Sequence, residues 1–130
     1  MTKKILIADD EPNIVAALEY LLKQRAYDVH TARDGNEALR VVEHVVPDLV
    51  LLDVMMPQTS GYEVCQIIRK RAEWRDIRII MLSAKGRDSE VVKGLALGAD
   101  LYITKPFSTR ELMARIEELL GSGSRNAEAQ

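Results

Sequence analysis

The sequence predicts an α/β fold in which helices cover both faces of a parallel β-sheet. Short apolar runs alternate with longer segments whose apolar residues recur at spacings of three and four, the period of one helix face. Five such strands alternate with five such helices, and a helix that connects two parallel strands must pack on the sheet. The chain has 130 residues, 47% of them hydrophobic, which is enough to bury the core of one such domain.

The first half of the chain contains three of the strands, predicted at residues 5–8, 27–31 and 49–52. Pro12 occupies the first turn of the first helix, where proline is tolerated. The turn Asp34-Gly35 leads into a second helix, which Pro47 ends. The residues expected to face inward from these helices are Ile14, Ala17, Leu18, Leu21 and Leu22 in the first, and Ala38, Leu39, Val42 and Val45 in the second.

The second half contains two more strands, predicted at residues 77–82 and 101–104. A helix is expected from Gly61 to Ala72, and another from Asp88 to Leu97, ended by Gly98. Ser108 is expected to cap the last helix. The inward faces of the third and last helices contain Val64, Cys65 and Ile68, and Leu112, Ile116 and Leu119.

The strand compositions indicate which strands are central. The first, third and fourth strands are apolar without alternation, as strands buried on both faces are. We expect a flavodoxin-like (βα)5 three-layer sandwich, and the strand order of that fold, 2-1-3-4-5, would place these three strands in the middle of the sheet. Residues 1–120 would form the domain, and residues 121–130, which begin Gly-Ser-Gly-Ser, have the composition of a flexible tail or linker remnant.

Polar side chains fall at the predicted carboxyl ends of four of the five strands. Asp9 and Asp10 follow the first strand, Asp53 ends the third, Ser83 follows the fourth and Lys105 follows the fifth. Carboxyl ends of parallel strands meet at one edge of the sheet, where ligands of open α/β sheets bind. With the first and third strands adjacent, we expect the three carboxylates to share one pocket.

This pocket would be net negative, which favours a bound cation. Hard oxygen ligands suit Mg²⁺, with Mn²⁺ as a possible substitute. With a divalent ion and Lys105 nearby, Asp53 becomes a candidate nucleophile towards a phosphoryl group, because a carboxylate can form an acyl phosphate. Ser83 offers a hydroxyl to a phosphate oxygen. Alone, each of these residues would more often be a turn, cap or solvated residue. The prediction of a phosphorylation site therefore depends on all of them meeting at one edge.

Composition restricts the classes of function. The net charge of −2 gives no basic surplus, so we expect no direct nucleic-acid binding by this chain. The single cysteine rules out an internal disulfide and is typical of a reducing compartment, so a cytoplasmic location is expected. No apolar run approaches ~20 residues, and the N-terminus lacks the features of a signal peptide, so no membrane association is expected.

Four segments resemble the receiver domain of two-component response regulators. They are ILIADDEPN, PDLVLLDVMMPQTSG, IIMLSA and GADLYITKPFS, and the resemblance covers about residues 3 to 120. It implies that Asp53 is the phosphoacceptor and that Asp10 is a direct Mg²⁺ ligand, with Asp9 as its supporting acid. Asp53 and the main-chain carbonyl of Met55 would be the other protein ligands.

The resemblance also assigns the residues around the phosphoryl group. Ser83 resembles the hydroxyl position that bonds the phosphoryl oxygen, and Lys105 resembles the phosphate-binding lysine. The bond between Lys105 and Pro106 is expected to be cis, which the preference of X-Pro bonds permits. Tyr102 matches the aromatic switch position: when the phosphoryl group draws Ser83 inward, Tyr102 would fill the vacated space.

By the same resemblance, a sensor histidine kinase or a histidine phosphotransfer protein would supply the phosphoryl group. The chain would be a signalling receiver that catalyses only its own phosphorylation and dephosphorylation. Phosphorylation would change the surface of the fourth helix, fifth strand and fifth helix. This change would act on a downstream effector protein or on an output domain fused beyond Gln130.

The C-terminal half most resembles the branch that dimerises through this surface and carries a winged-helix DNA-binding domain. That branch shows Asp-Asp-Tyr where this chain has Asp100-Leu101-Tyr102, and it favours cations near Val91 and Glu118. The departures remove charges expected in the branch's dimer salt bridges. A monomer and a phosphorylation-dependent homodimer both stay open.

Three other functions make different demands on the same residues. A degenerate receiver, a binding module that works without phosphorylation, usually lacks one of the acids or the lysine, and none is missing. A metal-dependent phosphatase of the haloacid dehalogenase type needs a second acid two residues after its nucleophile, where this chain has Met55. A flavodoxin-like FMN carrier needs a Ser/Thr/Gly phosphate loop after the first strand, where this chain has Asp9-Asp10-Glu11.

Overall fold

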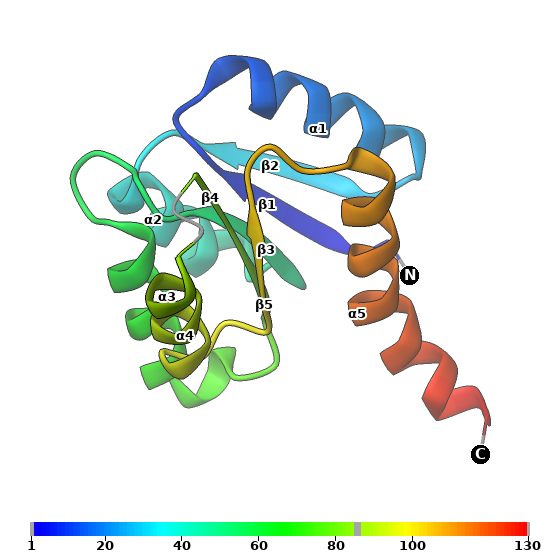
Figure 1. Ribbon diagram of the computed structural model, residues 1–130. Coiled ribbons are helices and arrows are strands. Elements are labelled where there is room, and N and C mark those ends of the chain that lie inside the picture. Colours follow the sequence, from blue (N-terminus) through cyan, green and yellow to red (C-terminus); the bar gives the residue numbers. More distant parts are fainter. Residues whose placement is uncertain (1, 85–86, 130) are drawn as a thin grey trace.

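A computed structural model describes residues 2–84 and 87–129, and for residues 122–129 it describes the backbone alone. Its five strands form a parallel sheet in the order β2-β1-β3-β4-β5 (Figure 1). The strands are β1 (Lys4–Ala8), β2 (Asp28–Ala32), β3 (Leu49–Asp53), β4 (Arg78–Ser83) and β5 (Leu101–Thr104). The helices are α1 (Pro12–Gln24), α2 (Gly35–Val45), α3 (Gly61–Lys70), α4 (Asp88–Ala96) and α5 (Thr109–Ala129), with a 3-10 turn η1 (Ala72–Trp74) after α3. The predicted flavodoxin-like fold and strand order are confirmed.

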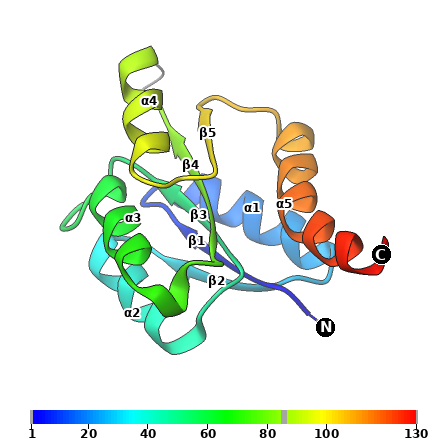
Figure 2. The same cartoon turned by 90° about the horizontal axis from the view of Figure 1, so that it is seen from below.

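The helices form two outer layers. α1 and α5 cover one face of the sheet, and α2, α3 and α4 cover the other (Figure 2). Successive strand residues point to opposite faces, so Leu6 packs with Val42 of α2, whereas Ile5 and Ile7 pack in the layer that contains Leu18 of α1. All five residues of β3 are buried because both layers cover this central strand.

The helix ends follow local signals. The side chain of Ser108 accepts a hydrogen bond of 3.2 Å from the Glu111 N–H, as predicted for a cap. Gly98, which follows α4, has a φ of 114°, a left-handed conformation that favours glycine. At the start of α3, Ser60 and Glu63 form a reciprocal capping box.

Two expectations differ from the structure. Ala17 was expected to face inward but is exposed, because Leu18 and Leu22 bury the α1 face instead. α3 ends at Lys70 and not at Ala72, because Arg71 adopts an extended conformation and the chain continues as η1. α5 runs on to Ala129, whereas the flexible tail expected at residues 121–130 stays a prediction. Gln130 lies outside the described residues, and the domain boundary at residue 120 stays a prediction.

In the described part of the chain, no helix combines the length and the apolar character needed to cross a bilayer.

Candidate functional site

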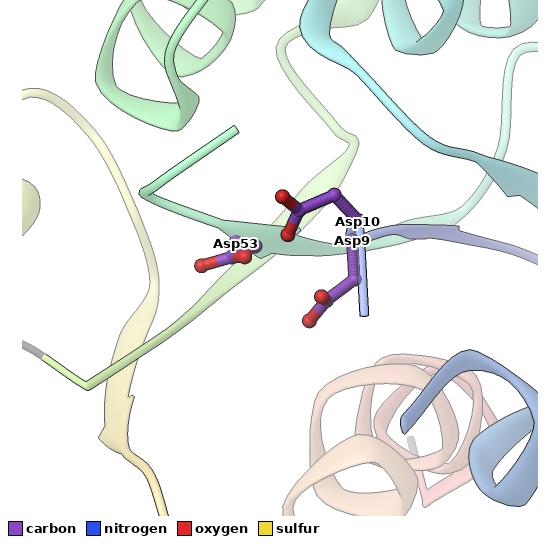
Figure 3. A group of neighbouring side chains, drawn as sticks. All are labelled: Asp9, Asp10 and Asp53. Atoms are coloured by element: carbon purple, nitrogen blue, oxygen red, sulfur yellow. The ribbon is translucent and has the colours of Figure 1, made fainter. Parts of the chain in front are cut away.

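Three acidic side chains meet at the carboxyl edge of the sheet (Figure 3). Ala8 pairs with Leu52, so the residues that follow β1 stand beside the end of β3. One carboxylate oxygen from each of Asp9, Asp10 and Asp53 lies within 4.8 Å of the others. Asp9 and Asp53 are buried, whereas Asp10 is exposed, so the cluster opens to solvent on the side of Asp10.

The neighbouring backbone holds the Asp53 side chain in position. The Met55 N–H donates a hydrogen bond of 3.1 Å to Asp53 Oδ1, which orients the carboxylate. Gly61, the first residue of α3, packs so closely that a Cβ there would lie 2.2 Å from the Asp53 carbonyl oxygen. A larger residue would therefore push α3 away from the end of β3.

Lys105 reaches the acidic cluster from the end of β5. Its Nζ lies 3.0 Å from Asp9 Oδ2 and 3.7 Å from Asp53 Oδ2, and it also contacts Glu11 Oε1 at 2.5 Å. The Lys105 N–H donates to the carbonyl oxygen of Ser83 at 2.7 Å, which anchors the backbone to β4. The peptide bond from Lys105 to Pro106 is cis, the isomer expected from the resemblance.

The electrostatics of the cluster favour a cation. Burial, followed by the charge of Asp9, raises the pKa of Asp53 to about 7, although the Met55 N–H and Lys105 oppose the rise. Burial alone would lower the pKa of Lys105, but its bonds to Glu11 and Asp9 and the charge of Asp53 raise it above its ordinary value. The lysine is therefore cationic at neutral pH, and the carboxylates still outnumber it.

The residues present fit a divalent metal ion. Carboxylate oxygens are the ligands that Mg²⁺ prefers, and three of them are already gathered here. The open side at Asp10 leaves room for the waters that Mg²⁺ retains. Asp9 is partly engaged, because its Oδ1 accepts the Glu11 N–H at 2.9 Å and its Oδ2 accepts from Lys105. Asp10 and Asp53 are accordingly the better-placed direct ligands, and the role of the Met55 carbonyl stays a prediction.

Ser83 and Tyr102 lie on the two strands beyond β3. Ser83 ends β4, fully buried, one residue past the Leu82 that pairs with Asp53. Tyr102, on β5, pairs with Met81 of β4. Its ring packs so closely on α4 that a Cβ at Gly94 would lie 2.7 Å from Tyr102 Cδ2. The two predicted switch residues therefore lie on adjacent strands.

Sequence reasoning missed three residues near the site. Glu11 contacts Lys105, although only its place next to Asp10 could have drawn attention to it. Tyr62 of α3 donates to Glu90 Oε1 of α4 at 2.7 Å, and it also hydrogen-bonds Tyr102. Burial, followed by these hydrogen bonds, raises the pKa of Tyr62. No local pattern marks Tyr62 or Glu90, because their contacts join three different elements.

Comparisons with known proteins agree on one family. Residues 5–117 match the family model of the response regulator receiver domain. A crystal structure of a putative response regulator from Chloroflexus aurantiacus J-10-fl is 33% identical, with a TM-score of 0.87, and the match covers 93% of this chain and 99% of that one.

Two further structures support the same conclusion. The BeF3-activated receiver domain of DrrB is 36% identical, with a TM-score of 0.84 and coverage of 93% of this chain and 99% of that one. The chemotaxis protein CheY4 of Vibrio cholerae is 29% identical, with a TM-score of 0.86 and coverage of 92% of this chain and 100% of that one. The likeness therefore extends over essentially the whole length of each of these chains.

Proposed function

This chain belongs to the response regulator receiver family, and we propose on that basis that Asp53 accepts a phosphoryl group in a Mg²⁺-dependent phosphorelay. Receiver domains of this family are the phosphoacceptor modules of two-component signalling. The observation that carries the assignment to Asp53 is its position: a buried carboxylate at the end of the central strand, beside two more acids and within 3.7 Å of Lys105 Nζ.

The geometry supports a division of roles among these residues. In an in-line transfer, an Asp53 carboxylate oxygen attacks the phosphorus, the P–N bond to the donor nitrogen breaks, and that nitrogen takes up a proton. Asp10, Asp53 and the main-chain carbonyl of Met55, supported by Asp9, would hold Mg²⁺, which offsets charge on the transferring oxygens when it is bound. Lys105 would also offset negative charge on the transferring oxygens, because its ammonium already lies beside the acidic cluster.

The readout would use the strands beside the site. Ser83 bonds a phosphoryl oxygen, and Tyr102 moves towards the space that Ser83 leaves, which alters the surface of α4, β5 and α5. The donor would be a sensor histidine kinase or a histidine phosphotransfer protein in the cytoplasm. The recipient would be an effector protein or a fused output domain. Whether two copies pair through this surface is a separate question that the oligomeric mass of the phosphorylated protein answers.

Intact mass spectrometry tests the proposal. Protein incubated with Mg²⁺ and phosphoramidate is expected to gain one phosphoryl group, and the gain should disappear when EDTA removes the metal. Asp53→Asn should abolish the main product. Asp76→Asn, which makes the same change at an exposed position, should label normally. Undiminished labelling of Asp53→Asn would show that another residue is the acceptor.

A further inference from the structure

Glu11 is the residue closest to the Lys105 ammonium. Its Oε1 lies 2.5 Å from Lys105 Nζ, compared with 3.0 Å for Asp9 Oδ2 and 3.7 Å for Asp53 Oδ2. The lysine side chain is only 11% exposed, whereas the Glu11 side chain is 55% exposed and reaches in from the solvent side. The acid closest to the Lys105 ammonium is therefore Glu11, which lies outside the cluster of Asp9, Asp10 and Asp53.

Glu11 is held in place by its own backbone. Its N–H donates to Asp9 Oδ1 at 2.9 Å, and its carbonyl oxygen accepts the N–H groups of Ile14 and Val15 as α1 begins. The residue is thus fixed at the junction of the site loop and α1. Its carboxylate can reach Lys105 without any movement of the sheet.

An ammonium group has three N–H donors, and here two of them are directed at Glu11 and Asp9. The Asp53 oxygen, at 3.7 Å, is beyond hydrogen-bond distance. To bond an oxygen of a phosphoryl group on Asp53, Lys105 must weaken or break its contact with Glu11 or with Asp9. Glu11 competes for the same ammonium because its carboxylate makes the shortest of the three contacts.

We propose that Glu11 is a positioning residue that holds Lys105 in the unphosphorylated protein and competes with the phosphoryl group for it. The inference rests on the proposed function of Asp53. Glu11 stabilises the unphosphorylated state selectively, so it shifts the equilibrium away from the phosphorylated one. The ion pair between Glu11 and Lys105 is partly exposed. Removing the Glu11 charge should therefore strengthen phosphoryl binding only about two- to fivefold.

Beryllofluoride, a phosphoryl mimic that binds an aspartate carboxylate, measures this competition directly. In the presence of Mg²⁺, Glu11→Gln should bind beryllofluoride about two- to fivefold more tightly than the parent protein by calorimetry. Glu19→Gln is the matched control. Glu19 lines the same hollow as Asp10, but its carboxylate pairs with Lys23 at 3.0 Å, so its loss should leave the affinity unchanged.

A double-mutant cycle separates action through Lys105 from a general effect of charge. In a Lys105→Met background, Glu11→Gln should no longer change the affinity. A gain that persists without the lysine, or an equal gain in Glu19→Gln, would overturn the inference, as would unchanged affinity in Glu11→Gln. Failure of the parent protein to bind beryllofluoride at all would instead contradict the proposed function.

A measurement without metal or phosphoryl mimic gives a second readout. In EDTA, the side-chain NH₃⁺ resonance of Lys105, assigned by its absence from Lys105→Arg, should be visible because the ammonium is hydrogen-bonded and partly shielded. Glu11→Gln should shift and broaden this signal, and Glu19→Gln should not. An unaltered Lys105 signal in Glu11→Gln would show that Glu11 does not hold the lysine in solution.

Discussion

Arg69 Nη2 donates a hydrogen bond of 3.1 Å to Asp100 Oδ2 and so ties α3 to the residue that precedes β5. The same carboxylate oxygen accepts the Ile79 N–H at 2.8 Å, and Arg69 Nε donates to the Gly98 carbonyl oxygen at 2.8 Å. The two side chains are 21% and 25% exposed. Asp100 is therefore engaged within its own chain.

Replacing Asp100 should destabilise the monomer. Asp100→Asn removes the charge that faces Arg69 and weakens the bond to the Ile79 N–H, so the free energy of unfolding should fall by about 1–3 kcal/mol. Urea unfolding measures the loss. Asp76→Asn, at an exposed position, should change it by less than about 0.5 kcal/mol. Equal stability of the two variants would show that the Asp100 pair contributes nothing.

Removing the Tyr62 hydroxyl should loosen the contact between α3 and α4. Tyr62→Phe keeps the ring beneath Lys93 but loses the bond to Glu90 Oε1, so the free energy of unfolding should fall by about 1 kcal/mol. Tyr20→Phe is the control, because Tyr20 is 63% exposed. If both variants unfold at the same urea concentration as the parent, the Tyr62 hydroxyl is not a stabilising contact.

The pH dependence of stability should reveal the raised pKa of Asp53. Burial and the charge of Asp9 raise this pKa to about 7, whereas the unfolded chain should titrate near its ordinary value of about 4. Between these values the folded state binds more protons, so the stabilising contribution is complete below about pH 4 and is lost as the pH rises through about 7. The asparagine of Asp53→Asn does not titrate, so this variant should not lose stability as the pH rises through about 7.

In EDTA, Asp53→Asn should therefore match the parent protein near pH 4 and exceed its free energy of unfolding at pH 8, by up to about 4 kcal/mol. Thermal or urea unfolding across this range measures the difference. A difference that is constant with pH would contradict the raised pKa.

Magnesium should stabilise the folded protein through the acidic cluster. At a free concentration of ~10 times its Kd, a ligand that binds only the folded state adds ~1.4 kcal/mol, which should appear as a higher Tm that EDTA reverses. Asp10→Asn should lose most of this gain because it removes the exposed carboxylate of the cluster. Asp76→Asn should retain it. An undiminished gain in Asp10→Asn would place the ion elsewhere.

Local pattern was sufficient for most of the fold. Apolar runs and helical periods predicted every strand, and every helix except the end of α5, to within a few residues, because burial acts on each element separately. Two predictions were wrong where local pattern does not decide the outcome. Ala17 is exposed because Leu18 is buried in its place, and α3 ends early because Arg71 adopts an extended conformation.

The sequence by itself determined the α/β class and, once the flavodoxin-like strand order is assumed, the meeting of Asp9, Asp10 and Asp53 at one edge, because parallel strands align their carboxyl ends. Tertiary structure alone decided which acid Lys105 binds. Glu11 is 94 residues away in the chain, and its reach depends on where β5 ends, how α1 begins and which side-chain conformations fit between them. The Tyr62 contacts to Glu90 and Tyr102 depend in the same way on how α3, α4 and β5 pack, and packing between distant elements leaves no local signal.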